Sequence, residues 1–354
     1  LMKAAAKATY GRKGDDVVKK NWAAIDAGAK QVVEIEVPES WKSCEDEGLF
    51  TPEVKGGKDD VVAFVKNIQS KVNAQEGNTL PVSTFTDYAD GSTPSGSAAY
   101  EKRGIAVDIP VWQSENCIQC NRCAYVCPHA VIRPVALTED ELAKAPEGTK
   151  AIDMIGMPGM KFTMTVSAYD CTGCGSCVNV CPGKKGEKAL VMANMEENAA
   201  EQDIFDFGRE IEVKPEVVAK FKPETVKGSQ FKQPLLEFSG ACAGCGETPY
   251  AKLITQLFGD RMYIANATGC SSIWGNSSPS TPYTMNSKGQ GPAWSNSLFE
   301  DNAEFGYGML LAQKAIRKRL KEEVETVAAS EQASAEVKAA CQEYLDTFKR
   351  RCYR

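Results

Sequence analysis

The chain has 354 residues, a net charge of −6 and 14 cysteines. No block of like charge indicates a nucleic-acid partner, and no apolar stretch is long enough to cross a bilayer. The cysteines are too sparse for a disulfide scaffold, and the first twenty residues contain no secretory signal. We therefore expect a reducing location, either the cytoplasm or a reducing anaerobic organelle. The single histidine, His129, nearly excludes histidine-based catalysis.

The first part of the chain predicts two helices, a strand and a connector. Apolar residues at helical spacing predict helices over 14–31 and 58–72. Residues 31–37 alternate like a strand, and Pro38 ends it. Residues 77–99 are rich in Gly, Ser, Thr, Pro and Asp, which predicts an extended connector.

The middle of the chain predicts short strands around two cysteine-rich runs. Residues 105–112 read as a strand that leads into the first run, and residues 160–166 as one that leads into the second. Between them, a short helix over 138–145 begins with a capping-box pattern. Residues 188–213 supply two further strand candidates, and the prolines after residue 214 indicate a linker.

The last third predicts part of an α/β layer. A helix begins at Thr248-Pro249 and ends at Gly259, and a buried strand follows over 262–267. Residues 303–348 return to helical spacing. We expect only one strand here, so the predicted doubly wound domain is partial.

Each cysteine-rich run reads C-x2-C-x2-C-x3-C-P, the spacing of bacterial [4Fe–4S] sites. Zinc sites need four ligands in two separated pairs, and disulfides belong to small secreted chains, so both alternatives fit poorly. In two-cluster ferredoxins the fourth cysteine of a run ligates the other cluster. We therefore predict crossed quartets: Cys117, Cys120, Cys123 and Cys181 for one cluster, and Cys171, Cys174, Cys177 and Cys127 for the other.

A third group of cysteines lies in the last third. Cys242 and Cys245 form a C-x2-C pair among glycines, and Cys270 follows the predicted strand. Loops at strand ends are where α/β sheets bind ligands. The alternative is a redox dithiol or a pair of buried thiols. A [4Fe–4S] cluster needs a fourth thiolate, and the remaining candidates, Cys44, Cys341 and Cys352, fit a free thiol better.

Several stretches together resemble pyruvate:ferredoxin (flavodoxin) oxidoreductase. They are Gly77–Ser83, Tyr100–Arg103, the two cysteine runs, Cys242–Tyr250, Thr268–Gly275 and Pro292–Asn302. The resemblance identifies the chain as an internal fragment of that enzyme. It implies that residues 1–55 end a coenzyme-A-associated α/β domain, that 56–99 form a linker domain and that 100–213 form a ferredoxin-like domain with two [4Fe–4S] clusters. Residues 214–354 would begin a thiamine-diphosphate-binding domain.

The resemblance also implies site residues, cofactors and partners. Cys242, Cys245 and Cys270 match three ligands of a proximal cluster whose fourth ligand is missing here. Glu247 and Cys270 match positions that line thiamine diphosphate, which is held with Mg2+ in the complete enzyme. That enzyme converts pyruvate and coenzyme A to acetyl-CoA and CO2 as a homodimer, with ferredoxin or flavodoxin as the electron acceptor.

We expect this chain to serve the electron-transfer and partial cofactor-binding portion of such an oxidoreductase. It would need the missing domains and would not decarboxylate pyruvate alone. The alternative is a stand-alone two-cluster electron carrier without catalysis. The Cys242–Glu247 region and Cys270 discriminate between the two, because a simple ferredoxin would not need them.

Overall fold

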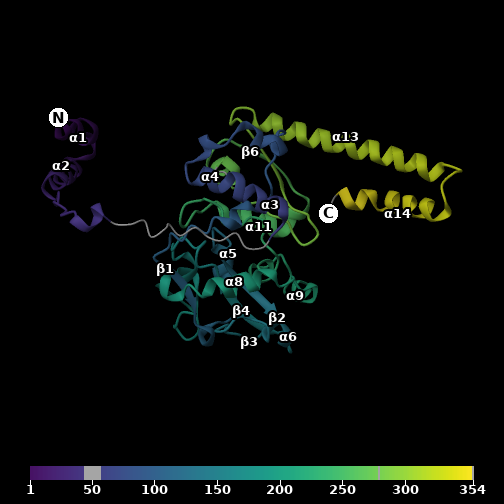
Figure 1. Ribbon diagram of the computed structural model, residues 1–354, viewed down its shortest axis with the longest axis horizontal. Coiled ribbons are helices and arrows are strands. Elements are labelled where there is room, and N and C mark those ends of the chain that lie inside the picture. Colours follow the sequence, from purple (N-terminus) through teal and green to yellow (C-terminus); the bar gives the residue numbers. More distant parts are fainter. Residues whose placement is uncertain (44–56, 278–279, 353–354) are drawn as a thin grey trace. The chain divides into compact units, whose positions relative to one another are not determined.

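The structure, a computed structural model, describes residues 1–43, 57–277 and 280–352. It divides into two compact units, Leu1–Thr51 and Pro52–Arg354 (Figure 1). In the first unit, α1 (Met2–Tyr10) packs on α2 (Asp15–Lys30), and the indole N–H of Trp22 donates to the carbonyl of Lys3 at 2.8 Å. The helix predicted over 14–31 is confirmed by α2.

The strand predicted over residues 31–37 is wrong. These residues are irregular, and their side chains are exposed. A strand is stabilised by a ladder of hydrogen bonds to a neighbour. Among residues 1–43 the structure has no second strand to supply that ladder, so the alternation of apolar and acidic residues is not sufficient.

The second unit begins with the predicted helix over 58–72. It is continuous through α3 (Asp59–Phe64), the π-helical turn Val65–Gln69 and α4 (Ser70–Asn73), and its apolar stripe is buried. The extended connector predicted over 77–99 is wrong, because much of it winds into 3-10 turns. These turns are Gly77–Thr79, Val82–Tyr88 and Ser97–Tyr100. The same turn-forming residues that predicted a break support these local turns.

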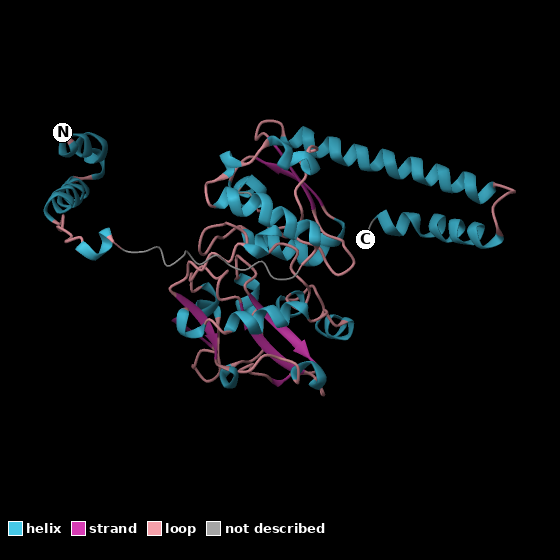
Figure 2. Cartoon of the chain, viewed as in Figure 1, coloured by secondary structure: helices cyan, strands magenta, loops and turns pink. Residues whose placement is uncertain are grey.

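Two small antiparallel sheets hold the cysteine-rich runs (Figure 2). In the first sheet, β1 (Asp108–Trp112) pairs with β5 (Leu190–Asn194), so that Ile109 faces Ala193. The second has the order β2-β4-β3, with the bounds β2 Ile132–Leu137, β4 Lys161–Val166 and β3 Ile152–Asp153. Strands β1 and β4 confirm the predictions for 105–112 and 160–166.

Helices surround these sheets. The capping box of α6 (Glu139–Leu142) is confirmed: Glu141 N–H donates to Thr138 Oγ1 at 3.2 Å, and Thr138 N–H donates to Glu141 Oε2 at 2.7 Å. Of the two strands predicted within 188–213, only β5 forms. The other segment is α8 (Glu201–Glu210), whose buried face packs against β4.

The expected linker after residue 214 also contains helices. These are α9 (Pro215–Phe221) and α10 (Val226–Ser229). The segment between α10 and α11 then returns to the core of the cysteine-rich part. Phe231 contacts Phe162 edge-to-face at a ring separation of 6.4 Å, and Phe162 contacts Trp112 in the same way at 6.0 Å. The main buried cluster therefore extends from Ala98 to Phe238.

The last part of the chain has a small parallel sheet. Helix α11 (Thr248–Phe258) precedes β6 (Tyr263–Ala267), as predicted, and Gly259 caps the helix. The expectation of a single strand is wrong, because β7 (Ala293–Ser297) pairs with β6 in parallel. Its polar sequence, AWSNS, lacks the apolar run by which a buried strand is predicted.

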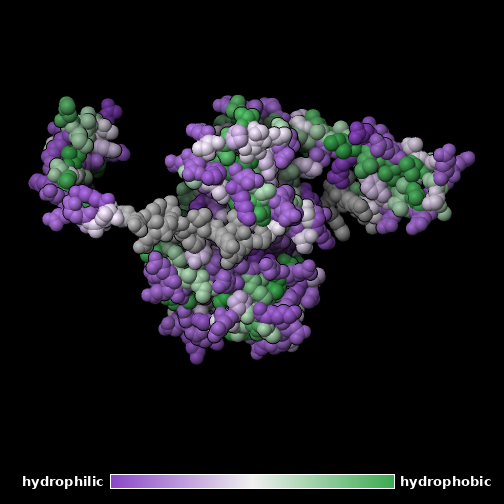
Figure 3. Space-filling view, in the orientation of Figure 1, coloured by the Kyte–Doolittle hydropathy of each residue, from purple (hydrophilic) through white to green (hydrophobic). Residues whose placement is uncertain are grey.

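Long helices complete the chain. After the short α12 (Cys270–Ser272) come α13 (Asn302–Ala329) and α14 (Ala335–Cys352), which pack as a hairpin. They confirm the helical pattern predicted for 303–348, with a break at Ser330. Apolar side chains, green in Figure 3, follow this hairpin, and Leu310, Ile316 and Leu320 on α13 are exposed.

Candidate metal centre

The two cysteine-rich runs adopt the same local conformation. Gln119 and Asn121 have positive φ angles of 55° and 58°, and Gly173 and Gly175 take 66° and 71° at the equivalent positions. Each pair of left-handed residues curls the chain tightly ahead of a short helix, α5 (Arg122–Val126) or α7 (Ser176–Val180). In both runs the N–H of the residue two after the first cysteine lies 3.4 Å from that cysteine's Sγ. The runs thus turn thiols and N–H groups toward a common centre.

The first predicted quartet lines one cavity. Three of its thiols come from the first run and the fourth from the end of the second run: Cys117, Cys120, Cys123 and Cys181. Burial raises the pKa of the Cys117 thiol, and the charges of Cys120 and Cys181 raise it further. The structure therefore brings together the four thiols that the crossed pattern predicts for this quartet.

A buried tryptophan also lines this cavity. The Trp112 indole N–H has no hydrogen-bond partner among the described residues, yet it lies near enough to the Cys117 thiol to lower the pKa of that thiol. A buried N–H without a partner is costly. The sulfur atoms of an iron–sulfur cluster accept hydrogen bonds, so the lining fits such a group. Trp112 was not predicted as a site residue, although its position at the end of a strand before a cysteine run was an available signal.

In the second predicted quartet, the thiol of Cys127 affects two thiols of the other run. Burial raises the pKa of Cys171 to about 12, and the charge of Cys127, from the other run, contributes to this rise. Cys127 acts in the same direction on the buried thiol of Cys177. Helices α5 and α7 contact each other, so the last cysteine of each run lies beside the other run.

In residues 1–43, 57–277 and 280–352, no three His, Cys, Asp or Glu side chains are close enough to hold one metal ion. A cubane places each thiolate on a different iron, so its ligands stand farther apart than those of one ion.

The third cysteine group contacts the second run. Cys242 and Cys245 share a tight turn, in which Cys245 N–H donates to the Cys242 carbonyl at 3.0 Å. Gly244 in this turn has φ +70°, and a Cβ placed on it would lie 3.7 Å from Cys174 Cβ. The turn therefore lies against a predicted ligand of the second quartet.

The other residues predicted for this region lie at the surface. Cys270 begins α12 after β6 and is exposed, and Glu247 precedes α11 and is exposed too. Cys341 is half-buried on α14. Cys44 and the side chain of Cys352 lie outside the part of the chain that the structure describes.

The Glu101-Lys102-Arg103 tripeptide fastens the second run. Asp170 directly precedes Cys171, and its carboxylate forms an ion pair with Lys102 Nζ at 2.6 Å. Lys102 Nζ also lies 4.8 Å from the centre of the Phe238 ring. Arg103 pairs with Glu101 and lies against Gly240, where an added Cβ would come within 3.3 Å of its guanidinium. The tripeptide thus joins the second run to the segment that leads into the Cys242 turn.

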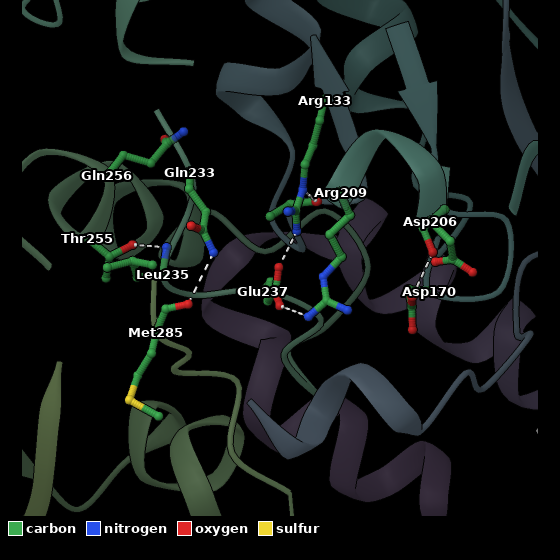
Figure 4. Close-up of polar contacts among 12 residues, drawn as sticks. Arg133, Asp170, Asp206, Arg209, Gln233, Leu235, Glu237, Thr255, Gln256 and Met285 are labelled. Carbon is green, nitrogen blue, oxygen red and sulfur yellow. Dashed lines mark hydrogen bonds and ion pairs between the residues drawn. The ribbon is translucent and has the colours of Figure 1, made fainter. Parts of the chain in front are cut away.

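An ion triad around the buried Glu237 supports the same segment (Figure 4). Glu237 is 1% exposed, and both Arg133 from β2 and Arg209 from α8 point at its carboxylate, with Arg209 at 2.7 Å. Burial alone would raise the pKa of Glu237, but Arg209 and Arg133 lower it. His129, two residues after Cys127, has its Nδ1 3.0 Å from the carbonyl of Ser239. Neither Glu237 nor His129 was predicted to have a role at this site.

Comparison with known families agrees with this geometry. Residues 116–185 match a family described as a 4Fe-4S dicluster domain, and residues 52–106 match the EKR family, described as a domain of unknown function. The chain thus contains a 4Fe–4S dicluster domain. Within the described residues, no helix is long and apolar enough to cross a membrane.

Curated relatives are similar over nearly the whole chain. Pyruvate:ferredoxin oxidoreductase of Moorella thermoacetica is 54% identical over 95% of this chain, and pyruvate-flavodoxin oxidoreductase of Enterobacter agglomerans is 53% identical over 91%. Pyruvate dehydrogenase (NADP+) of Cryptosporidium parvum is 48% identical over 91%. The chain spans 28%, 26% and 17% of these relatives' lengths, respectively.

Proposed function

We propose that this chain, a homologue of the pyruvate:ferredoxin and pyruvate-flavodoxin oxidoreductases, holds two [4Fe–4S] clusters and passes electrons through them. The observation that carries the proposal is the position of the thiols. Four cysteines from both runs line one cavity, and Cys127 interacts with the thiols of the opposite run. Eight cysteines thereby supply four thiolates to each of two clusters, the number that a cubane requires.

The protein around the proposed clusters has three tasks. The thiolates bind iron, the turns of the two runs direct N–H groups at sulfur, and the buried apolar lining keeps water away. These features are the means by which proteins set cluster potentials. When bound, each cluster supplies one-electron transfer, a chemistry that belongs to the cofactor.

The proposed order of electron transfer follows from the contacts of the third cysteine group. The Gly244 turn lies against Cys174, so electrons from a centre at Cys242 and Cys245 would enter the cluster of Cys171, Cys174, Cys177 and Cys127 first. The cluster of the other quartet would follow. Helices α5 and α7, which carry ligands of both, are in contact.

The wider reaction is also a proposal. We infer that the source of electrons is pyruvate oxidation with coenzyme A, carried out where thiamine diphosphate and Mg2+ bind near Glu247 and Cys270. Cys242, Cys245 and Cys270 would hold a proximal cluster together with a fourth ligand. The acceptor would be ferredoxin or flavodoxin, as in the names of two relatives. A stand-alone electron carrier is less favoured, because the similarity continues through the C-terminal part of the chain.

Electron transfer by the cluster-loaded chain tests the proposal. The chain is reconstituted anaerobically with iron and sulfide, reduced with dithionite, freed of excess reductant and mixed with oxidised ferredoxin or flavodoxin. We expect about eight irons bound by the eight cysteines of the two runs, and reduction of the acceptor followed by its absorbance. A chain that binds iron at the level of one cluster or less contradicts the proposal.

Paired cysteine substitutions test the crossed ligands. If Cys127 and Cys171 serve the same cluster, Cys127→Ser and Cys171→Ser together remove only that cluster, and about four irons remain. The matched pair, Cys127→Ser with Cys117→Ser, removes both clusters. Uncrossed quartets give the opposite result for the two pairs, and Cys341→Ser serves as a control that leaves the iron content unchanged.

A further inference from the structure

Lys252 is a buried cation that joins α11 to the first cysteine-rich run. Its side chain is 1% exposed, although lysine is almost never fully buried without a partner. Its Nζ contacts three backbone carbonyls, those of Ala124, Tyr125 at 3.2 Å and Cys127 at 3.1 Å. These carbonyls lie in and directly after α5, which carries Cys123. The contact therefore links positions 125 to 128 residues apart.

The geometry of this contact indicates an ammonium group. An ammonium has three N–H donors and no acceptor, and here it meets three acceptors. A neutral amine would turn its lone pair toward one of the carbonyls. The last carbonyls of a helix have no partner within it and carry a partial negative charge, so they favour a cation.

The charge lies close to the thiols of both proposed clusters. Burial lowers the pKa of Lys252 to about 8, and the thiols of Cys127 and, less strongly, Cys123 oppose this fall. Cys127 is a proposed ligand of one cluster and Cys123 of the other. Arg133 also faces this region, but it is paired with Glu237. Among residues 1–43, 57–277 and 280–352, no carboxylate forms an ion pair with Lys252, so its charge is not cancelled.

We propose that the charge of Lys252 raises the reduction potentials of the two proposed clusters, one ligated by Cys127 and the other by Cys123. This inference rests on the proposed clusters. On reduction, a cluster gains one electron from the reductant, no covalent bond forms or breaks, and the negative charge of the cluster with its thiolates increases by one. A fixed buried cation stabilises the more negative state, and net charge is one of the factors that set cluster potentials. The low dielectric of the interior strengthens this interaction.

The effect is largest at the cluster that Cys127 holds. Of the two cysteines, Cys127 is the one whose own carbonyl contacts Lys252 Nζ, at 3.1 Å. Lys252 belongs to α11, outside the cysteine-rich segment. Lys252, a residue of the C-terminal part, would therefore adjust the reduction potentials of the clusters that the cysteine-rich segment is proposed to hold.

Reduction potentials of Lys252 variants test the inference. The cluster-loaded chain is titrated with mediators at pH 7, and the reduced clusters are followed by electron paramagnetic resonance. In Lys252→Met and Lys252→Gln, we expect the ratio of reduced to oxidised cluster at a fixed potential to fall at least tenfold for one cluster. For a one-electron couple, this equals a shift of about 59 mV to more negative values. Lys252→Arg, which keeps the charge, stays within about twofold.

The controls separate charge from structure and this inference from the proposed function. Lys220→Met removes an exposed lysine of α9 and leaves both potentials unchanged. The inference is overturned if the clusters of Lys252→Met and Lys252→Gln have the same reduction potentials as those of the unchanged chain. It is also overturned by a failure of both variants to hold clusters while Lys252→Arg holds them, because the role is then structural. Absence of clusters from the unchanged chain overturns the proposed function instead.

Discussion

At the scale of single residues, the carboxylate of Glu237 shows how this interior tolerates charge. It accepts from two arginines, and the aromatic rings of Phe205 and Phe238 stack on the guanidinium of Arg133. Burying ions without partners costs more than the attraction of a well-made pair returns. The triad is therefore stable only while all three members are present.

Replacing Glu237 should destabilise the second unit. Glu237→Gln keeps the shape but leaves two arginines without their counter-charge. Breaking a buried pair costs roughly 3–5 kcal/mol, and the lower end applies because Arg209 is partly exposed. Urea unfolding followed by circular dichroism measures the change. Glu210→Gln, at an exposed position of the same helix as Arg209, should stay within about 0.5 kcal/mol. Equal effects of the two variants would contradict the role of the triad.

The same residue predicts a dependence of stability on pH. Because the arginines lower the pKa of Glu237 in the folded chain, its contribution is fully present above the unfolded pKa, about 4.3. It is lost as pH falls through the folded value. We expect the stability difference between the chain and Glu237→Gln to be constant near neutral pH and to shrink below about pH 4. A difference that persists unchanged into strong acid would argue against this assignment.

At the scale of elements, a sequence pattern is a good predictor where the structure depends only on neighbouring residues. The capping box at Thr138 was predicted from two residues and forms with both hydrogen bonds. The strand at 31–37 failed, because its formation depends on a partner strand that residues 1–43 do not provide. Residues 188–213 predicted two strands, but α8 forms in the second half of this range, with Ile204, Phe205 and Gly208 on one helical face. Strand β7 was missed because its residues are polar.

The capping box gives a prediction at this scale. Thr138→Ala removes the acceptor for the Glu141 N–H and should lower the free energy of unfolding by about 1 kcal/mol. Thr138→Ser retains the hydroxyl and should be nearly neutral. Thermal unfolding of the two variants, compared with the unchanged chain, measures the effect. A loss for Thr138→Ser as large as that for Thr138→Ala would show that packing of the methyl group matters more than the cap.

At the scale of the whole molecule, the proposed clusters and the core belong together. Cys123, Cys127, Cys171 and Cys177 are part of the same buried cluster as Phe162 and Phe231. The spacing of the runs predicts crossed quartets, because in two-cluster ferredoxins the fourth cysteine of a run ligates the other cluster. Lys252 and Glu237 could not be predicted, because Lys252 contacts residues 125 to 128 positions away and Glu237 contacts Arg133, 104 positions away.

Removal of iron should therefore unfold more than the metal sites. Metal binding supplies folding free energy wherever the ligands are gathered only in the folded state. We expect anaerobic chelation of the loaded chain to abolish its cooperative thermal transition, followed by near-ultraviolet circular dichroism of the buried tryptophans. Restoring iron and sulfide should restore the transition. An iron-free chain that melts at the same temperature as the loaded chain would contradict this.

The reach of Lys252 across to α5 has a consequence for engineering. Judged by its motifs alone, the cysteine-rich segment is a separable module that can be cut out or replaced by a foreign ferredoxin in a chimera. A cut after residue 213 would leave three helix-end carbonyls without their cation. It would also separate Phe231 and Phe238 from the core that they complete. A chimera that keeps only the segment with the eight cysteines lacks the contacts of Lys252, Phe231 and Phe238. The segment that is exchanged should therefore end after α11.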